Sequence, residues 1–358
     1  MDRERLVKTF CELVKIPSES PNDQEFISYM EKLLKKEGAS TAVDAFGNLV
    51  AYFPAKGSES TEPVMFCCHA DTVKPGKGIQ PVIDGNIIRS KGDTILAADD
   101  KAGVAEVIEM LRSAKKHPPI EFLLARCEEI SGGGAEHLDR KLIRSKMGYV
   151  IDMDTPDEIV TGGPTYFVLH VKYKGRSAHA GMAPEKGISA IQAAAVAVSR
   201  LRLGRIDEES TANVGVMKGG QNMNSIPEDL EIYAECRSLD DKKSHALAEE
   251  MTQIFQKAAE EFGTHVSIEK KTVLACYNIP KDSKVVTIAA KAMEKNGIKP
   301  DIKAIAGGTD ATHLNHYGIQ TAALGIGARQ MHSTEEHAVI DEMVATTKVI
   351  ITIVEDLA

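Results

Sequence analysis

The sequence predicts an α/β protein with a mixed, largely parallel sheet sandwiched by helices, and a smaller α+β domain inserted into it. Apolar runs of strand length alternate with segments of helical spacing at both ends of the chain. Several of these runs stop at acidic residues, and the middle of the chain changes to long alternating strands. Strands that are joined by helices indicate parallel pairing with right-handed crossovers.

The composition is that of a soluble globular protein with room for two domains. The chain has 358 residues, of which 43% are hydrophobic and 27% are charged. A net charge of -9 without a basic block argues against a nucleic acid or an anionic membrane as partner, and favours small molecules or peptides.

Three features favour a cytoplasmic location. The N-terminus opens a charged amphipathic helix and lacks the apolar core of a signal peptide, and the apolar run 349–354 is too short to span a bilayer. The cysteines show neither metal-type nor disulfide-type spacing, which predicts reduced thiols. They are Cys11, Cys67, Cys68, Cys127, Cys236 and Cys276.

The first half begins with two helical stripes, at 6–14 and 27–34, followed by strands over Asn48–Phe53 and Val64–Cys68. The second strand leads directly into His69-Ala70-Asp71. Residues two apart on an extended segment face the same way, so Asp71 can reach the back of the His69 ring. Carboxylates commonly orient metal-bound histidines in this manner, although a lone His-x-Asp is weak evidence.

Two adjacent acids, Asp99 and Asp100, stand at the head of the next helical segment, after a hairpin predicted over residues 78–93. Helix capping explains one of them but not both. We therefore predict that Asp99 projects toward His69 and that Asp100 caps the helix.

The strand Ile120–Arg126 ends at the pair Glu128-Glu129, and the strand Met147–Ile151 ends at Asp152. Successive strand side chains point to opposite sides, so one glutamate could bind a metal while the other handles a proton. A solvated strand end is the alternative. The turn 131–134 lacks the spacing of a nucleotide-binding loop, so no nucleotide site is predicted there.

An inserted domain is predicted over residues 164–274, because the element order there is β-α-β-β-α-β, the split ferredoxin-like arrangement. Residues 1–163 and 275–358 then form one discontinuous domain. Its second part carries a helix over Val285–Lys295, a strand over Thr321–Ile326 and the loop residue His332.

Five residues at or just beyond these strands form a nitrogen and oxygen ligand set suited to zinc, manganese or cobalt. Asp71 and Glu128 add two more carboxylates at the same edge. Each like-charge pair at 4 Å costs roughly 4 kcal/mol at an effective dielectric near 20, which two metal ions sharing a carboxylate would offset. The five residues are His69, Asp99, Glu129, Asp152 and His332.

Taken together, these motifs resemble the dinuclear zinc exopeptidases, a family that includes peptidase T, carboxypeptidase G, aminoacylase and succinyl-diaminopimelate desuccinylase. The resemblance covers nearly the whole chain and is strongest to the peptidase T branch. It rests on His69-x-Asp71, Asp99-x-Lys101-x-Gly103, Glu128-Glu129, Asp152, Gly175-Arg176-Ser177-Ala178-His179, Asn224-Ser225-Ile226-Pro227, Arg237, Gly307-Gly308-Thr309-Asp310 and His332. Ala97 departs from the pattern, because that branch commonly has glycine there.

The resemblance implies two zinc ions per chain, with cobalt or manganese as possible substitutes. Asp99 would bridge the ions, with His69 and Asp152 completing one set of ligands and Glu129 and His332 completing the other. It also implies that Asp71 orients His69 and that Glu128 is the general base for a metal-activated water.

For the inserted domain, the resemblance implies a homodimer in which His179 reaches the partner's site and donates a hydrogen bond to the tetrahedral oxyanion. Arg237 would bind a substrate carboxylate, with a surface ion pair as the alternative. Asn224 would contact substrate or oxyanion. Gly307 and Gly308 would approach substrate through bare backbone, unless they form a plain turn before a helix.

The predicted activity is hydrolysis of short peptides, as in a tripeptide aminopeptidase. An N-acyl-amino-acid deacylase or a carboxypeptidase is the nearest alternative, because the same machinery hydrolyses their amide bonds. A non-catalytic binding protein is a remote alternative, since a structural metal site does not need the additional acid Glu128.

Overall fold

The structure is a computed structural model that describes residues 1–130 and 133–358. Ser131 and Gly132, half of the turn considered above for a nucleotide site, lie outside the described residues. The described chain divides into two compact units. The first comprises Met1–Gly162, Tyr277–Ala304 and Thr309–Ala358, and the second comprises Gly163–Cys276 and Ile305–Gly308.

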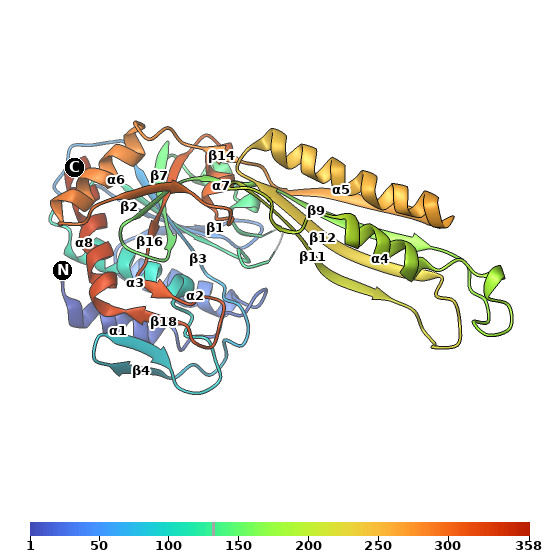
Figure 1. The fold of residues 1–358 in the computed structure, drawn as a ribbon. Coiled ribbons are helices and arrows are strands. Elements are labelled where there is room, and N and C mark those ends of the chain that lie inside the picture. The colour runs from blue at the N-terminus through green and yellow to red at the C-terminus, as the bar shows by residue number, and fades with distance from the viewer. Residues whose placement is uncertain (131–132) are drawn as a thin grey trace. The chain divides into compact units, whose positions relative to one another are not determined.

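A mixed sheet organises the first unit (Figure 1). Among the described residues it has nine strands. Its order is β1-β2-β6-β3-β7-β16-β8-β14, and β15 pairs with β8. The strands are β1 (Ser40–Val43), β2 (Leu49–Phe53), β3 (Val64–His69), β6 (Ile120–Ala125), β7 (Met147–Met153), β8 (Glu158–Gly163), β14 (Tyr277–Asn278), β15 (Asp301–Ala304) and β16 (Gln320–Gly325).

The centre of this sheet is parallel, as predicted. Strand β3 pairs in parallel with β6 and β7, and β7 pairs in parallel with β16. Antiparallel pairs flank this centre, between β2 and β6 on one side and between β8 and β16 on the other. The carboxyl ends of four parallel strands therefore meet at one edge, which is where open α/β sheets carry their sites.

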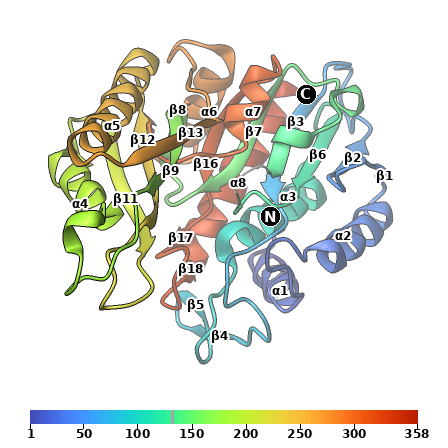
Figure 2. The ribbon, with the colours of Figure 1, turned by 90° about the vertical axis from the view of Figure 1, so that its right-hand side faces the viewer.

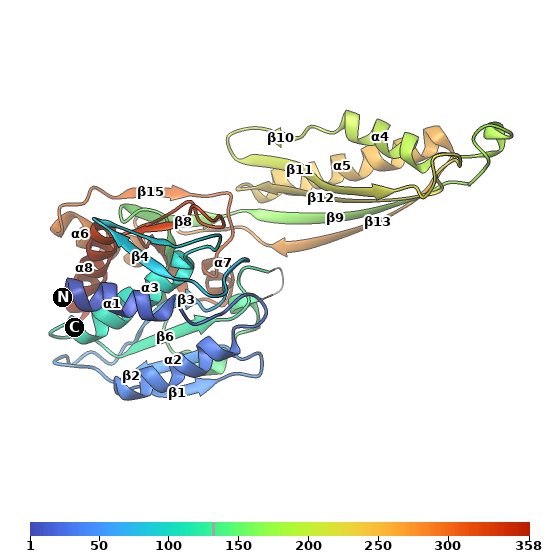
Figure 3. The same ribbon diagram turned by 90° about the horizontal axis from the view of Figure 1, so that it is seen from below.

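Helices cover both faces of the sheet. Every residue of β3 and β6 is buried as a consequence. Figures 1 and 3 show α1, α2 and α3 gathered on one face, where α3 contacts β3 and β7. The helices of this unit are α1 (Arg3–Leu13), α2 (Gln24–Lys36), α3 (Ala98–Ser113), α6 (Lys284–Lys295), α7 (Ala311–His316) and α8 (Ile340–Leu357). None of the described helices is long and apolar enough to cross a membrane.

A small antiparallel sheet, in the order β17-β18-β5-β4, accounts for the predicted hairpin. Gly85 turns the hairpin with φ +59°, a conformation that glycine adopts readily. Pairing of β18 with β5 brings the segment that follows His332 beside it. The strands are β4 (Pro81–Asp84), β5 (Ile87–Ser90), β17 (Ala328–Arg329) and β18 (His337–Val339).

The second unit has the predicted β-α-β-β-α-β order with one additional two-residue strand, β10, after the first helix, and its antiparallel sheet has the order β10-β11-β12-β9-β13. Figure 2 shows α4 and α5 side by side on one face of this sheet, over a core that includes Phe167, Ile232 and Phe255. The elements are β9 (Thr165–Lys174), α4 (Ala190–Arg200), β10 (Gly204–Arg205), β11 (Ser210–Gly219), β12 (Asp229–Ser238), α5 (Asp241–Phe262) and β13 (His265–Leu274).

Candidate metal centre

The candidate ligands come from separate elements that meet at the carboxyl edge of the first unit's sheet. His69 ends β3, Asp152 lies near the end of β7, and Asp99 lies at the start of α3. Glu129 follows β6 in the chain, and His332 lies between β17 and β18.

Asp99 lies between the two histidines. Its Oδ1 is 2.8 Å from Nε2 of His69, and its Oδ2 is 3.1 Å from Nε2 of His332. Each oxygen of this one carboxylate therefore contacts a different imidazole, which is the geometry needed of a bridging ligand.

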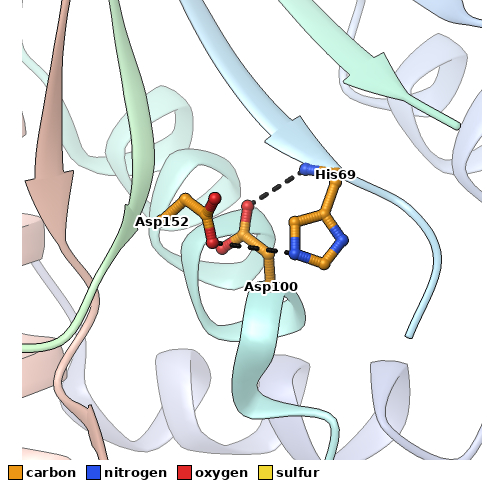
Figure 4. Close-up of side chains that lie close together, drawn as sticks. All are labelled: His69, Asp100 and Asp152. Carbon is orange, nitrogen blue, oxygen red and sulfur yellow. Dashed lines mark hydrogen bonds and ion pairs between the residues drawn. The ribbon is translucent and has the colours of Figure 1, made fainter. Parts of the chain in front are cut away.

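Each histidine also contacts a second carboxylate. Nε2 of His69 is 3.6 Å from Oδ1 of Asp152, a contact drawn in Figure 4, and Nε2 of His332 is 3.0 Å from Oε2 of Glu129. The five predicted ligands thus form two clusters that share Asp99. A second grouping of His69 is geometrically possible, because Asp100 and Asp152 also offer oxygen atoms close to its ring.

Asp100 does not cap α3, so that prediction was wrong. Its Oδ2 accepts a hydrogen bond of 3.1 Å from the backbone N–H of His69, as Figure 4 shows. Its Oδ1 is buried without a hydrogen-bond partner among the described residues. Asp100 is fully buried, and its carboxylate fixes the end of β3 through this hydrogen bond.

Crowded carboxylates shift the pKa values of the cluster. Burial lowers the pKa of His69, but the carboxylates of Asp99, Asp152 and Asp71 together outweigh burial, and the net pKa is well above the usual value. Hydrogen bonds that His332 donates to the carboxylates of Asp99 and Glu129 raise its pKa to about 10. Burial, followed by repulsion from Asp99, raises the pKa of Asp152 to about 8. Without a cation, the site holds more negative charge than its buried setting favours.

The residues present fit a pair of divalent cations. Imidazole nitrogens and carboxylate oxygens are the donors that zinc, manganese and cobalt accept. Oε1 of Glu129 is buried and lacks a hydrogen-bond partner among the described residues, so it has coordination capacity to spare. Ligand atoms of His69, Asp99 and Glu129 lie within 4.8 Å of one another, as do those of His69, Asp100 and Asp152.

Asp71 holds the back of the site together. Nδ1 of His69 is 2.9 Å from the backbone carbonyl oxygen of Asp71 and 3.6 Å from its carboxylate, so the nearest acceptor is the backbone. The carboxylate accepts hydrogen bonds from the backbone N–H groups of Glu128, at 2.9 Å, and Glu129, at 3.2 Å. It also accepts a hydrogen bond from the hydroxyl of Ser20.

Glu128 lies next to the clusters and is a candidate for proton transfer. Burial raises its pKa well above the usual value, and the carboxylates of Asp152, Asp310 and Glu129 raise it further against the lowering effect of His69. A carboxyl group with a raised pKa can hold a proton near neutral pH, as a general base must after accepting one.

Two residues that hydrogen-bond to the site were not predicted from the sequence. Ser20 bonds Asp71 across 51 positions of sequence, and Glu336 bonds the turn before Asp99 from 237 positions away. The acid pair Glu335-Glu336 shortly after His332 was the available signal, but its partners depend on the tertiary fold.

The predicted residues His179 and Asn224 belong to the second unit, where both are exposed. The carbonyl oxygen of Asn224 accepts a hydrogen bond from Ala180 N–H, so the two residues lie on adjacent segments. Nδ1 of His179 accepts from the N–H groups of Gly181 and Met182, both at 3.2 Å. The neutral ring therefore carries its proton on Nε2, free to donate.

Arg237, Gly307 and Gly308 also belong to the second unit. Arg237 bonds Glu235 at 2.8 Å and lies over the ring of Tyr166 at 4.0 Å, which is the predicted alternative of an ion pair. Packing alone explains why residue 308 is glycine, because a Cβ there would lie 2.4 Å from the Leu274 side chain. The turn also precedes α7, and Gly307 is exposed.

The α/β unit with its cluster of histidines and carboxylates, joined to a ferredoxin-like unit, defines the class of metal-binding hydrolases. Comparisons with known proteins narrow this class. Residues 166–263 match the peptidase dimerisation domain of the M20 family, and residues 245–349 match the M42 glutamyl aminopeptidase family.

Full-length relatives cover the rest of the chain. The chain is 35% identical to the uncharacterised protein YqjE of Bacillus subtilis, over 100% of both chains. It is 36% identical to the solved aminopeptidase PepT of Bacillus cereus, with a TM-score of 0.91 over 100% of this chain and 99% of that one. A solved tripeptidase of Staphylococcus aureus is 30% identical, with a TM-score of 0.96 over the same shares.

The chain therefore belongs to the M20 peptidase family, and within it to the peptidase T group. It is a hydrolase of peptide bonds.

Proposed function

We propose that this protein is a dizinc aminopeptidase that releases the N-terminal residue of tripeptides. The observation that carries the proposal is the position of Asp99, whose two oxygens contact His69 at 2.8 Å and His332 at 3.1 Å. The aminopeptidase and tripeptidase named among its solved relatives supply the substrate class.

In this proposal, one ion is held by His69, Asp152 and Asp99, and the other by Glu129, His332 and Asp99. Cobalt or manganese would suit the same donors. The alternative use of Asp100 is less favourable, because its Oδ2 already accepts the His69 N–H and its other oxygen faces Gly103. When bound, the two ions would polarise the scissile carbonyl and lower the pKa of a water molecule.

Glu128 would then move the proton. Its carboxylate takes a proton from the attacking water, and its raised pKa lets the carboxyl group hold that proton until the leaving amine accepts it. Asp71 fixes the backbone positions of Glu128 and Glu129, because its carboxylate accepts hydrogen bonds from both of their N–H groups. The two adjacent glutamates would thus have separate tasks.

His179 would donate to the oxyanion from the partner subunit of a homodimer formed through the second unit. The match of residues 166–263 to a dimerisation domain supports the dimer. The two backbone donors on Nδ1 support the role of His179, because they leave the ring proton on Nε2, where a donor is needed.

Arg237 would bind the carboxylate of the peptide, with Asn224 near the same end or the oxyanion, and with the backbone of Gly307 and Gly308 beside the substrate. The Arg237 side chain is about one quarter exposed (27%), and Nη1, away from Glu235, donates a long hydrogen bond of 3.5 Å to the Ala306 carbonyl oxygen, which a substrate carboxylate would replace. We also propose a cytoplasmic location, since all six cysteines are free thiols in the structure, and we expect neither nucleic-acid nor membrane partners.

Hydrolysis of a matched substrate set tests this proposal. The zinc-loaded protein would be given a free tripeptide, its N-acetylated form, its C-terminal amide and an N-acyl amino acid. We expect release of the N-terminal residue from the free tripeptide and none from the N-acetylated form. Cleavage of the acylated compounds instead would make the protein a deacylase, and release of the C-terminal residue would make it a carboxypeptidase.

A further inference from the structure

A buried carboxylate, Glu336, binds the turn that leads into Asp99. Its Oε2 accepts the backbone N–H groups of Leu96 at 2.7 Å and Ala97 at 2.8 Å, and its Oε1 accepts the N–H of Asp99 at 3.0 Å. The residue is only 2% exposed. Hydrogen bonds to a charged carboxylate are strong, so these three bonds fix the backbone of the turn at three of its residues.

The backbone conformation of this turn is unfavourable without contacts from outside the turn. Ala97 has φ +60° and ψ +36°, the left-handed conformation in which a Cβ crowds the following carbonyl. A non-glycine residue holds such a conformation only where its surroundings impose it. Within the turn, the bond from Ala97 N–H to Glu336 is one of the contacts that do so.

Glu336 also connects the two clusters of the candidate metal centre. It lies four residues after His332, on the segment that leads into β18. One carboxylate therefore links the segment that presents His332 to the turn that presents Asp99, and these two side chains are 3.1 Å apart.

We infer that Glu336 is a positioning residue that holds Asp99 between His69 and His332, so that both metal ions depend on it although it binds neither. Both of its carboxylate oxygens accept backbone N–H groups, and among the described residues it makes no hydrogen bond to a candidate ligand's side chain. This inference rests on the metal centre proposed above.

The competing explanation is that Glu336 only stabilises the fold, as buried carboxylates elsewhere do. Glu121 offers a matched control for that role in the same unit. It is 1% exposed and accepts the backbone N–H groups of Arg144 at 3.0 Å and Ser145 at 2.9 Å. It lies at the start of β6, whereas the candidate metal centre lies beyond the end of that strand.

The test compares Glu336→Gln with Glu121→Gln in the full-length protein. Glutamine keeps the size of the side chain but presents an NH2 group to one of the backbone donors. Cobalt titration against a competing chelator gives the affinity for both ions, the visible spectrum of the cobalt protein reports ligand geometry, and thermal unfolding of the metal-free protein reports stability.

We expect Glu336→Gln to weaken cobalt binding by about 10- to 100-fold, the usual effect of losing a group that orients a ligand, and to change the cobalt spectrum. Glu121→Gln should lower the unfolding temperature without changing affinity or spectrum. The double variant Ala97→Gly/Glu336→Gln should recover part of the lost affinity, because glycine adopts the turn without support.

Parent-like affinity and spectrum in Glu336→Gln would overturn the inference while leaving the metal centre intact, as would equal losses in both single variants. Should Glu336→Gln fail to fold, Glu336→Asp decides, because its shorter side chain cannot hold all three N–H groups as the glutamate does: a folded Glu336→Asp with parent-like affinity and spectrum would overturn the inference. A parent protein that binds fewer than two ions would overturn the dinuclear centre and this inference with it.

Discussion

Replacing Asp71 with alanine is expected to release the backbone of Glu128 and Glu129 and to destabilise the fold. The carboxylate accepts the backbone N–H groups of Glu128 at 2.9 Å and Glu129 at 3.2 Å, as well as the Ser20 hydroxyl, and Asp71 is fully buried. Hydrogen bonds to a charged group contribute roughly 1.5–3 kcal/mol each, so losing the two N–H bonds should lower the free energy of unfolding by about 3–6 kcal/mol.

Urea unfolding of the metal-free protein measures this loss. Asp139→Ala is the control, because Asp139 accepts the N–H of Lys141 at 3.1 Å on an exposed turn, and its loss should cost about 1 kcal/mol. Asp71→Asn keeps one carbonyl acceptor and should fall between the two. A loss in Asp71→Ala no greater than that in Asp139→Ala, with unchanged peptide hydrolysis, would refute the argument.

Glu106→Gln should become more stabilising as pH rises. Glu106 is fully buried without a hydrogen-bond partner among the described residues, and burial followed by Asp100 raises its pKa well above 4.5. The folded state therefore keeps a proton that the unfolded state loses above pH 4.5, so the stability contribution is present below that pH and falls as pH rises. Thermal unfolding from pH 5 to 7 should show the variant gaining up to about 1.4 kcal/mol per pH unit over the parent, and a constant difference would contradict this. Arg237→Ala should raise KM at least 10-fold for a free tripeptide and leave KM for its C-terminal amide nearly unchanged; equal effects on both peptides would favour a purely structural ion pair. His179→Ala should lower kcat by about 10²–10³-fold without changing metal content, as expected for loss of one oxyanion donor, and unchanged kcat would exclude that role.

Much of the first unit could be predicted because its signals are local. Apolar strands that end at Glu128 and Asp152 appear in the sequence as runs followed by acids, and the parallel centre of the sheet follows from the helices between them. The short strands β14 and β15 carry too few residues for a periodic pattern, and β15 finds its place only by pairing with β8.

The residues that hold the candidate ligands in place through hydrogen bonds could not be predicted from the sequence. Ser20 and Glu336 act through hydrogen bonds to residues far away in the chain, so their roles depend on the complete fold. Adjacent acids were a further difficulty. Asp100 was expected to cap α3, but its carboxylate accepts the His69 N–H, a partner 31 positions away that only the tertiary fold brings close.

Metal content and tripeptide hydrolysis, measured together on Glu128→Gln and Glu129→Gln, test the central claim most directly. We expect Glu128→Gln to keep both metal ions and to lose turnover by about 10²–10⁴-fold, the usual contribution of general acid–base catalysis. We expect Glu129→Gln to bind fewer than two ions. Full activity in both variants, or metal loss in Glu128→Gln with both ions retained in Glu129→Gln, would contradict the proposed division of tasks between the two glutamates.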